Sequence, residues 1–411
     1  MKPFAKSAPE PAAAPEAGAR VTRDAQDFSF ILGGPLFQLL RRAHLSDDAL
    51  HLVRLRIGVI ALLAWLPLLG LSALEGTLRG GVTVPFFLDA DVHVRFLVAL
   101  PLLILAELVV HQRMRPIARA FLDRNLIPRE ALDRFDEAMR AAFRLRNSVL
   151  AELTLVGIVF GVGVFIIWRQ YTSLPASTWY GVPSPDGVRW SLAGTWYGYV
   201  SLPIFQFLLV RWYFRLFIWA RFLWQVARIE LSLVPTHPDR LGGLGFLSTT
   251  AHAFAVLLLA HGALVASQLA NRIFFLGAVL TDFKAEIGLM AAFLLCVVFG
   301  PLLVFSPQLA ACKRRGLREY GTLAGRYVRE FDVKWLRGGA PAGESIIGSA
   351  DIQSLADMNN SFEVVREMRL APISRDALVQ MAASFLLPIV PLALTMMPLE
   401  KLLEMLFGIL F

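Results

Sequence analysis

The sequence predicts an all-α membrane protein, a bundle of seven transmembrane helices accompanied by amphipathic helices on the cytoplasmic side. Hydrophobic residues make up 56% of the 411-residue chain, and charged residues, at 18%, fall mostly between long apolar stretches. A helix needs about 20 apolar residues to cross a hydrocarbon core of roughly 30 Å. These stretches lack polar positions at helical period, which favours membrane helices over amphipathic surface helices. We expect spans near Ile57–Leu74, Val92–His111, Val149–Trp168, Tyr199–Phe222, Thr250–Ala270, Ala285–Pro307 and Ala377–Met397.

The distribution of basic residues predicts which side each loop faces. Alternate non-span segments carry 30 lysines and arginines in one set and 6 in the other. Cytoplasmic loops of membrane proteins are enriched in basic residues, which is the positive-inside rule. This rule places the more basic set, and with it the N-terminus, in the cytoplasm and the C-terminus outside. The 34 arginines outnumber the 6 lysines, which favours a GC-rich genome and hence a bacterial plasma (inner) membrane. The basic set comprises 1–56, 112–148, 223–249 and 308–376.

The segments outside the spans differ in character. The Ala/Pro-rich start predicts a disordered tail, whereas residues 28 to 42 contain apolar side chains suited to the headgroup layer. In the last cytoplasmic loop, helices are expected near Leu309–Leu336 and Ala350–Leu370, separated by Gly338–Gly343. The predicted organisation is therefore 1–27 tail, 28–56 interfacial and pre-span helices, 57–307 six spans with a helical loop at 112–148, 308–376 helical loop, and 377–411 seventh span with an outer interfacial tail.

Aromatic residues gather in the predicted outer segment 169–198, between the third and fourth spans. Tryptophan and tyrosine are enriched where a membrane protein meets the headgroups. The segment is therefore expected to form an interfacial aromatic belt. Its members are Trp179, Tyr180, Trp190, Trp196 and Tyr197.

Four charged residues lie inside predicted spans at a similar depth. Glu107 and Glu152 are near the inner ends of the second and third spans, and Arg211 and Arg215 share one face of the fourth. Because an isolated charge is costly in the bilayer, we expect these residues to pair. The sequence leaves two interpretations open: an ion or anion pathway gated by the cluster, and a structural ion-pair network.

Two further spans carry polar or helix-breaking residues. His261 and Gln268 lie seven residues apart on one helix face, either as a polar stripe along a cavity or, for His261, as a hydrogen-bonded core histidine. Pro388 and Pro391 remove backbone hydrogen bonds inside the seventh span, which predicts a kinked or broken helix. Broken helices expose carbonyl groups that coordinate ions in some carriers, although prolines are also common in ordinary membrane helices.

A glycine-rich loop between the fourth and fifth spans is another candidate site. Its glycines allow the backbone to approach a ligand closely, and its arginine and free backbone amides suit a phosphate or lipid headgroup. The alternative is a tight turn in which the aspartate bonds to its own backbone. The spacing matches neither the P-loop nor the dinucleotide fingerprint. The residues are His237, Asp239, Arg240, Gly242, Gly243 and Gly245.

These features support three hypotheses of different classes. The leading hypothesis is a channel-like or carrier-like membrane protein of unknown substrate. The alternative is a non-transporting scaffold or sensor that binds a partner or anionic lipid through its cytoplasmic helices. A lesser alternative is an enzyme acting on a lipid headgroup through His237 and Asp239. Anionic headgroups are the expected partners, a homo-oligomer stays open, and we assign no catalytic residue, metal, cofactor or nucleic acid.

Overall fold

The computed structural model describes residues 33–42, 52–168, 176–184 and 187–396. The protein is mostly helical, at 77%. Five helices are long and apolar enough to cross a membrane, and two further bent helix pairs raise that number to seven if each is one span. The predicted helical fold with several helices able to span a membrane is confirmed, whereas the number of spans and their direction remain predictions.

The five long helices each contain one of the predicted spans. Several include short 3-10 or π turns, labelled η, which interrupt the α-helical hydrogen-bonding without ending the helix. The first is α3, Val53–Leu74. The second joins α4 (Ala90–Val94), η2 (Arg95–Ala99) and α5 (Leu100–Asp123). The third joins α9 (Leu192–Trp196), η5 (Tyr197–Ser201) and α10 (Leu202–Val226). The fourth joins η6 (Leu244–Phe254) and α11 (Ala255–Leu276).

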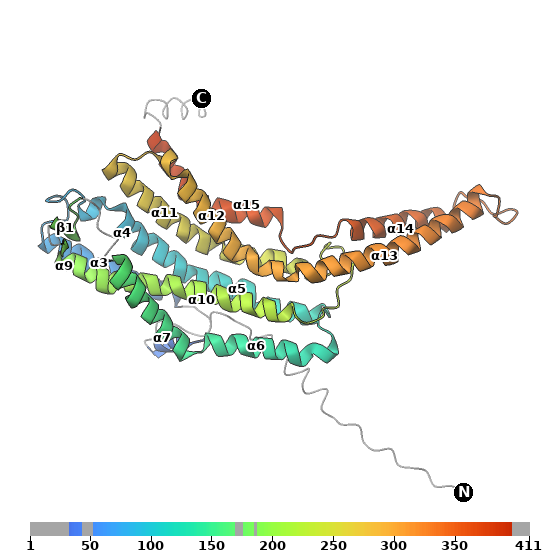
Figure 1. The fold of residues 1–411 in the computed structure, drawn as a ribbon, viewed down its shortest axis with the longest axis horizontal. Helices are drawn as coiled ribbons and strands as arrows, with labels where there is room; N and C mark the ends of the chain where they lie inside the picture. Colours follow the sequence, from blue (N-terminus) through green and yellow to red (C-terminus); the bar gives the residue numbers. More distant parts are fainter. Residues whose placement is uncertain (1–32, 43–51, 169–175, 185–186, 397–411) are drawn as a thin grey trace, which may run out of the picture.

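The fifth long helix extends far beyond the predicted sixth span. It runs without a sharp bend from Leu280 to Leu336, so the membrane segment and the following amphipathic helix form one rod. The helix α14 (Ala350–Arg366) packs back along α13, and Figure 1 shows the pair projecting from the bundle. We call this projecting pair, with the residues that connect the two helices, the arm. The rod comprises η7 (Leu280–Phe283), α12 (Lys284–Phe299), η8 (Gly300–Phe305), α13 (Ser306–Phe331) and η9 (Asp332–Leu336).

Two candidate spans are bent. In the first, α6 (Leu132–Arg146) meets the stretch Val149–Phe165 at 49°. α6 is amphipathic and packs under α10, whereas α7 (Val149–Ile158) and η4 (Val159–Trp168) are almost wholly apolar. In the second, α15 (Arg375–Leu386) and η10 (Val390–Met396) meet at 53°.

Loops predicted for one side of the membrane lie together in the structure. At one end, Val84 pairs with Thr178, and the Leu192 backbone N–H donates to Glu75. At the other end, the Ser232 N–H donates to the Leu126 carbonyl. The remaining short elements are α2 (Pro35–Arg42), η1 (Phe86–Leu88), η3 (Arg129–Ala131) and the hairpin β1 (Gly181–Ser184) and β2 (Gly187–Trp190).

Three aromatic residues of the outer segment 169–198 form a protein core instead of a membrane-facing belt. Trp179, Tyr180 and Tyr197 are buried, and Trp179 donates from its indole nitrogen to Asp89 at 2.7 Å. The prediction that these three side chains face the headgroups is therefore wrong. The segment also forms a β-hairpin, which the sequence did not predict, and the Trp190 ring of its second strand stacks on Tyr180 with centroids 6.5 Å apart.

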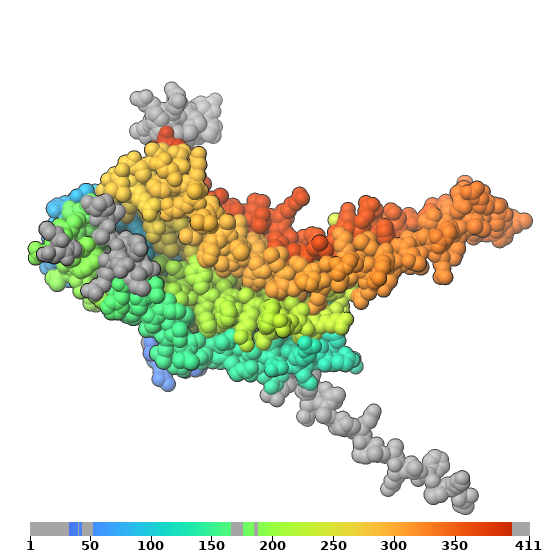
Figure 2. Space-filling model, viewed as in Figure 1, coloured from blue at the N-terminus to red at the C-terminus, as the bar shows by residue number. Residues whose placement is uncertain are grey.

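Several predictions fall outside the described residues. These are the disordered tail 1–27, most of the 28–56 segment and the outer interfacial tail beyond Met396. Within 28–56, the structure describes α2 and the start of α3, and Figure 2 shows the outer surface of the described bundle.

Candidate anion site in the helical bundle

The four charged residues predicted to pair do come together, and an arginine from the first long helix joins them. Glu107 on α5 accepts from Arg56 on α3 and from Arg215 on α10, the latter at 2.7 Å. Arg211, one turn before Arg215, lies 3.6 Å from Glu107 and 3.5 Å from Glu152 on α7. Four helices thus contribute to one network, which we call the charge cluster.

The charge cluster is buried and carries more arginines than glutamates. Side-chain exposure is 12% or less for every member. Among the residues that the structure describes, three guanidinium groups face two carboxylates, which leaves one excess positive charge when all are ionised. A buried charge without a counterion is unfavourable, because the low-dielectric surroundings cannot replace its hydration. The cluster is therefore suited to accept one further negative charge.

The short helix α2 closes one side of the cluster. The Leu36 backbone N–H donates to Glu152 at 2.8 Å, and the Gly34 N–H donates to the Asn147 side chain at 3.0 Å. Gly34 has a φ of +90°, and a Cβ there would lie 2.9 Å from the Arg146 carbonyl oxygen. The approach of α2 to the α6–α7 connection therefore requires glycine at this position.

A cavity of about 290 Å³ lies directly beside the charge cluster. Its charged lining consists of Arg56, Glu107 and Arg211, and its other eight lining residues are apolar side chains of α2, α3, α5 and α10. Binding sites for small molecules commonly combine apolar walls with a few convergent polar groups. This combination makes the cavity the candidate site, and we call it the cluster cavity.

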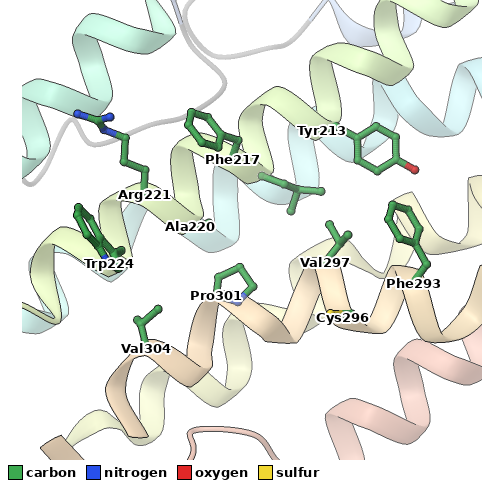
Figure 3. A pocket seen from close by; sticks show the side chains of 11 residues that line it. Tyr213, Phe217, Ala220, Arg221, Trp224, Phe293, Cys296, Val297, Pro301 and Val304 are labelled. Atoms are coloured by element: carbon green, nitrogen blue, oxygen red, sulfur yellow. The ribbon is translucent and has the colours of Figure 1, made fainter. Parts of the chain in front are cut away.

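A larger groove of about 780 Å³ runs between α10 and α12. Figure 3 shows Arg221 and Trp224 at one end of it and Tyr213 and Phe293 at the other. Apart from Arg221, its lining offers few polar groups, and no buried charge faces it. It therefore lacks the electrostatic feature that distinguishes the cluster cavity.

His261 makes two hydrogen bonds within the bundle. Its Nδ1 lies 2.8 Å from the Leu257 carbonyl oxygen and its Nε2 lies 2.8 Å from the Tyr213 hydroxyl. Since a carbonyl only accepts, Nδ1 donates there, and Nε2 then accepts from the tyrosine. Gln268 is exposed and lines neither cavity described above. The geometry matches the hydrogen-bonded core histidine and not a polar stripe shared by these two residues.

The helix containing Pro388 and Pro391 is interrupted where the prolines occur. α15 ends at Leu386, η10 begins at Val390, and the two axes differ by 53°. Pro388 lies against α11, where its Cδ would be 3.2 Å from a Cβ added at Gly262. The interrupted segment therefore packs closely against α11 at Gly262.

In the glycine-rich loop, the backbone N–H groups that a bound phosphate would need already donate hydrogen bonds to Asp239. Its carboxylate accepts from the backbone N–H groups of Leu241 at 2.7 Å, Gly243 at 3.2 Å and Gly245 at 2.7 Å. Although burial raises the pKa of Asp239, these amides and nearby His237 lower it below 3.8 overall. The headgroup hypothesis for this loop, including its enzymatic form, stays a prediction.

The other loop residues also have internal roles. His237 Nδ1 lies 2.9 Å from Asp239 Oδ1, and Arg240 forms an ion pair with Glu367 at 2.7 Å. Gly242 and Gly243 have φ values of +63° and +103°, which favour glycine. Together these contacts describe a turn that joins the loop to the end of α14.

The comparisons with known proteins add no family. No protein-family model, no curated protein and no solved structure matches the chain. Among the described residues, no group of three or more histidine, cysteine, aspartate or glutamate side chains is placed to hold a metal ion. The charge cluster and its cavity are therefore the features of the chain that point to a function.

Sequence reasoning missed Arg56 and the contribution of α2. Arg56 immediately precedes the predicted first span and was counted with the basic cytoplasmic residues. Its position at the inner end of that span, at the depth predicted for Glu107, is the signal that could have identified it. The contact between α2 and Glu152 has no comparable signal, because it depends on backbone groups.

Proposed function

We propose that this chain is a carrier-like protein of the bacterial inner membrane that binds an anion at the charge cluster. The observation that carries this proposal is the excess of buried arginines, with Arg56, Arg211 and Arg215 facing two glutamates. Charged groups inside membrane proteins are costly and are commonly associated with substrate or ion pathways. The positive excess favours an anion over a cation.

Flux through reconstituted vesicles tests this function. Vesicles containing the protein and loaded with radiolabelled chloride, phosphate or a small carboxylate should lose at least one of these anions faster than protein-free vesicles. Arg211→Gln should abolish the difference, because it removes the excess charge. Arg221→Gln is the matched control, since Arg221 lies on the same helix but is exposed and outside the cluster. No flux of any tested anion, or equal flux in both variants, would reject the proposal.

A second function, partner binding by the arm, is favoured by the shape of α13 and α14. The pair projects from the bundle, and its tip exposes apolar side chains, with Leu336 69% and Ile347 87% exposed. Exposed apolar groups on a soluble surface often mark interaction sites. This function corresponds to the scaffold alternative.

Pull-down with the full-length protein tests the arm. Ile347→Asp and Leu336→Asp should remove a cytoplasmic partner that wild-type protein retains, while leaving the bundle intact. Glu330→Lys, on the exposed surface of the same arm, is the control for a change of charge alone. An unchanged set of retained proteins would count against the arm as a docking element.

A further inference from the structure

The walls of the cluster cavity indicate a chemical class for its ligand. Apart from the three charged residues the lining is wholly apolar, and it includes Leu39 of α2, Ile60 and Leu63 of α3 and Phe207 of α10. An inorganic anion would leave these walls unfilled, whereas an alkyl chain would bury them. A ligand with both a negative charge and an apolar chain matches both the charged and the apolar part of the lining.

One buried polar atom at the cavity has no partner in the described structure. The Nε of Arg56 is buried and makes no hydrogen bond with any described residue, although its Nη2 contacts Glu107. The Arg56 side chain is only 3% exposed, and it lines the cavity. Buried N–H groups in proteins are nearly always paired, so a ligand oxygen would complete this one.

The cavity opens toward the outer surface of the bundle. Leu39 and Leu63, which line it, are 63% and 51% exposed. In a membrane protein, exposed apolar side chains on a spanning helix such as α3 face lipid instead of water. A ligand can therefore enter from the bilayer, and the depth predicted for Arg56 places its charged end toward the inner headgroups.

We infer that the cluster cavity binds an anionic phospholipid of the surrounding bilayer, with its phosphate at Arg56 and Arg211 and part of one acyl chain between α2, α3 and α10. The cavity volume of about 290 Å³ is at the lower end of ligand pockets, which suits part of one chain and not a whole lipid. This inference goes beyond the proposed function: it concerns binding alone and names a lipid of the bilayer as the anion held at the charge cluster.

Lipid retention in native mass spectrometry tests the inference. The protein is reconstituted in vesicles of equal parts phosphatidylcholine and phosphatidylglycerol and then released in mild detergent. We expect one phosphatidylglycerol to be retained per chain in preference to phosphatidylcholine. Arg56→Gln and Leu63→Trp should each reduce retention at least fivefold, the first by removing charge and the second by filling the cavity. Arg221→Gln and Leu62→Trp are matched controls, because Leu62 is 53% exposed and does not line the cavity.

The outcomes separate this inference from the proposed function. Equal retention of both lipids, or unchanged retention in Arg56→Gln and Leu63→Trp, would overturn the inference even if small anions cross the vesicle membrane. Displacement of the bound lipid by inorganic phosphate, with no effect of Leu63→Trp, would also overturn it and assign the cluster to a free anion. Retention that depends on both residues, without any anion flux, would support the lipid site and reject the small-anion carrier.

Discussion

Glu107 contacts three guanidinium groups at the centre of the charge cluster. We expect Glu107→Gln to lower the thermal unfolding midpoint strongly, because among the described residues it leaves the buried arginines with Glu152 alone as a counterion. Removing one partner of a buried ion pair costs about 3–5 kcal/mol. Glu286→Gln is the control, since Glu286 pairs with Arg272 on the surface and such pairs contribute about 0–1 kcal/mol. Equal shifts in detergent-solubilised protein would contradict a central role for Glu107.

The lowered pKa of Asp239 should make the stability of the fold depend on pH. Its folded-state pKa is lowered, so its ionised form stabilises the fold above the unfolded pKa, and this contribution is lost as pH falls through the folded value. Asp239→Asn should therefore be less stable than wild type at pH 7, with a difference that narrows below about pH 4. Chemical denaturation at a series of pH values measures this. Asp123→Asn, in an exposed pair with Arg119, should differ little from wild type at any pH. A constant difference for Asp239→Asn would contradict the assignment.

The helical elements were more predictable than their connections. Apolar stretches marked α3, α10 and α11, because a membrane span requires a long run of such residues. The continuity of α12 with α13 was not predictable from hydropathy, since the helix continues while its surroundings change from lipid to water. Tyr197 and Trp179 were misassigned because tertiary burial and interfacial placement select the same aromatic residues.

Of the candidate site, only four of the charged residues could be predicted from the sequence. Glu107, Glu152, Arg211 and Arg215 are conspicuous in apolar sequence, and the cost of burying charge implies that they pair. The cluster cavity depends on how α2 packs against α3 and α10, a relation between segments far apart in the sequence. No local pattern carries that information.

The contact between α11 and α15 depends on a single glycine. A Cβ at Gly262 would lie 2.0 Å from the Phe385 carbonyl oxygen, so Gly262→Ala must push the two helices apart. Close approach at small residues is a common mode of helix packing in membranes. We expect a fall in the thermal unfolding midpoint, corresponding to about 1–3 kcal/mol of overpacking. Gly288→Ala on α12 is the control, because no atom lies within 4 Å of its added Cβ. Similar midpoints for both variants would show that the contact is loose.

At the scale of the whole molecule, both bent helix pairs connect opposite ends of the bundle. Arg134 contacts the Arg228 carbonyl at one end, and Thr178 pairs with Val84 at the other, so the chain crosses between them. Likewise, Met368 contacts Lys313 near the first end, whereas η10 contacts η7 near the second. These contacts favour a crossing at each bent pair, and seven crossings remain the prediction.

Cysteine labelling of intact cells tests the direction of the bundle and the odd number of crossings made by the three long helices between the β-hairpin and the arm. In a Cys296→Ser, Cys312→Ser background, Pro183→Cys on the β-hairpin should react with a membrane-impermeant maleimide added outside. Ala342→Cys at the tip of the arm should react only after the membrane is permeabilised, because the basic segments predict that the arm is cytoplasmic. Both positions are exposed in the structure, so a difference in labelling reports sidedness and not burial. Labelling of both cysteines from outside would reject the odd number of crossings between them, and reversed labelling would reject the orientation.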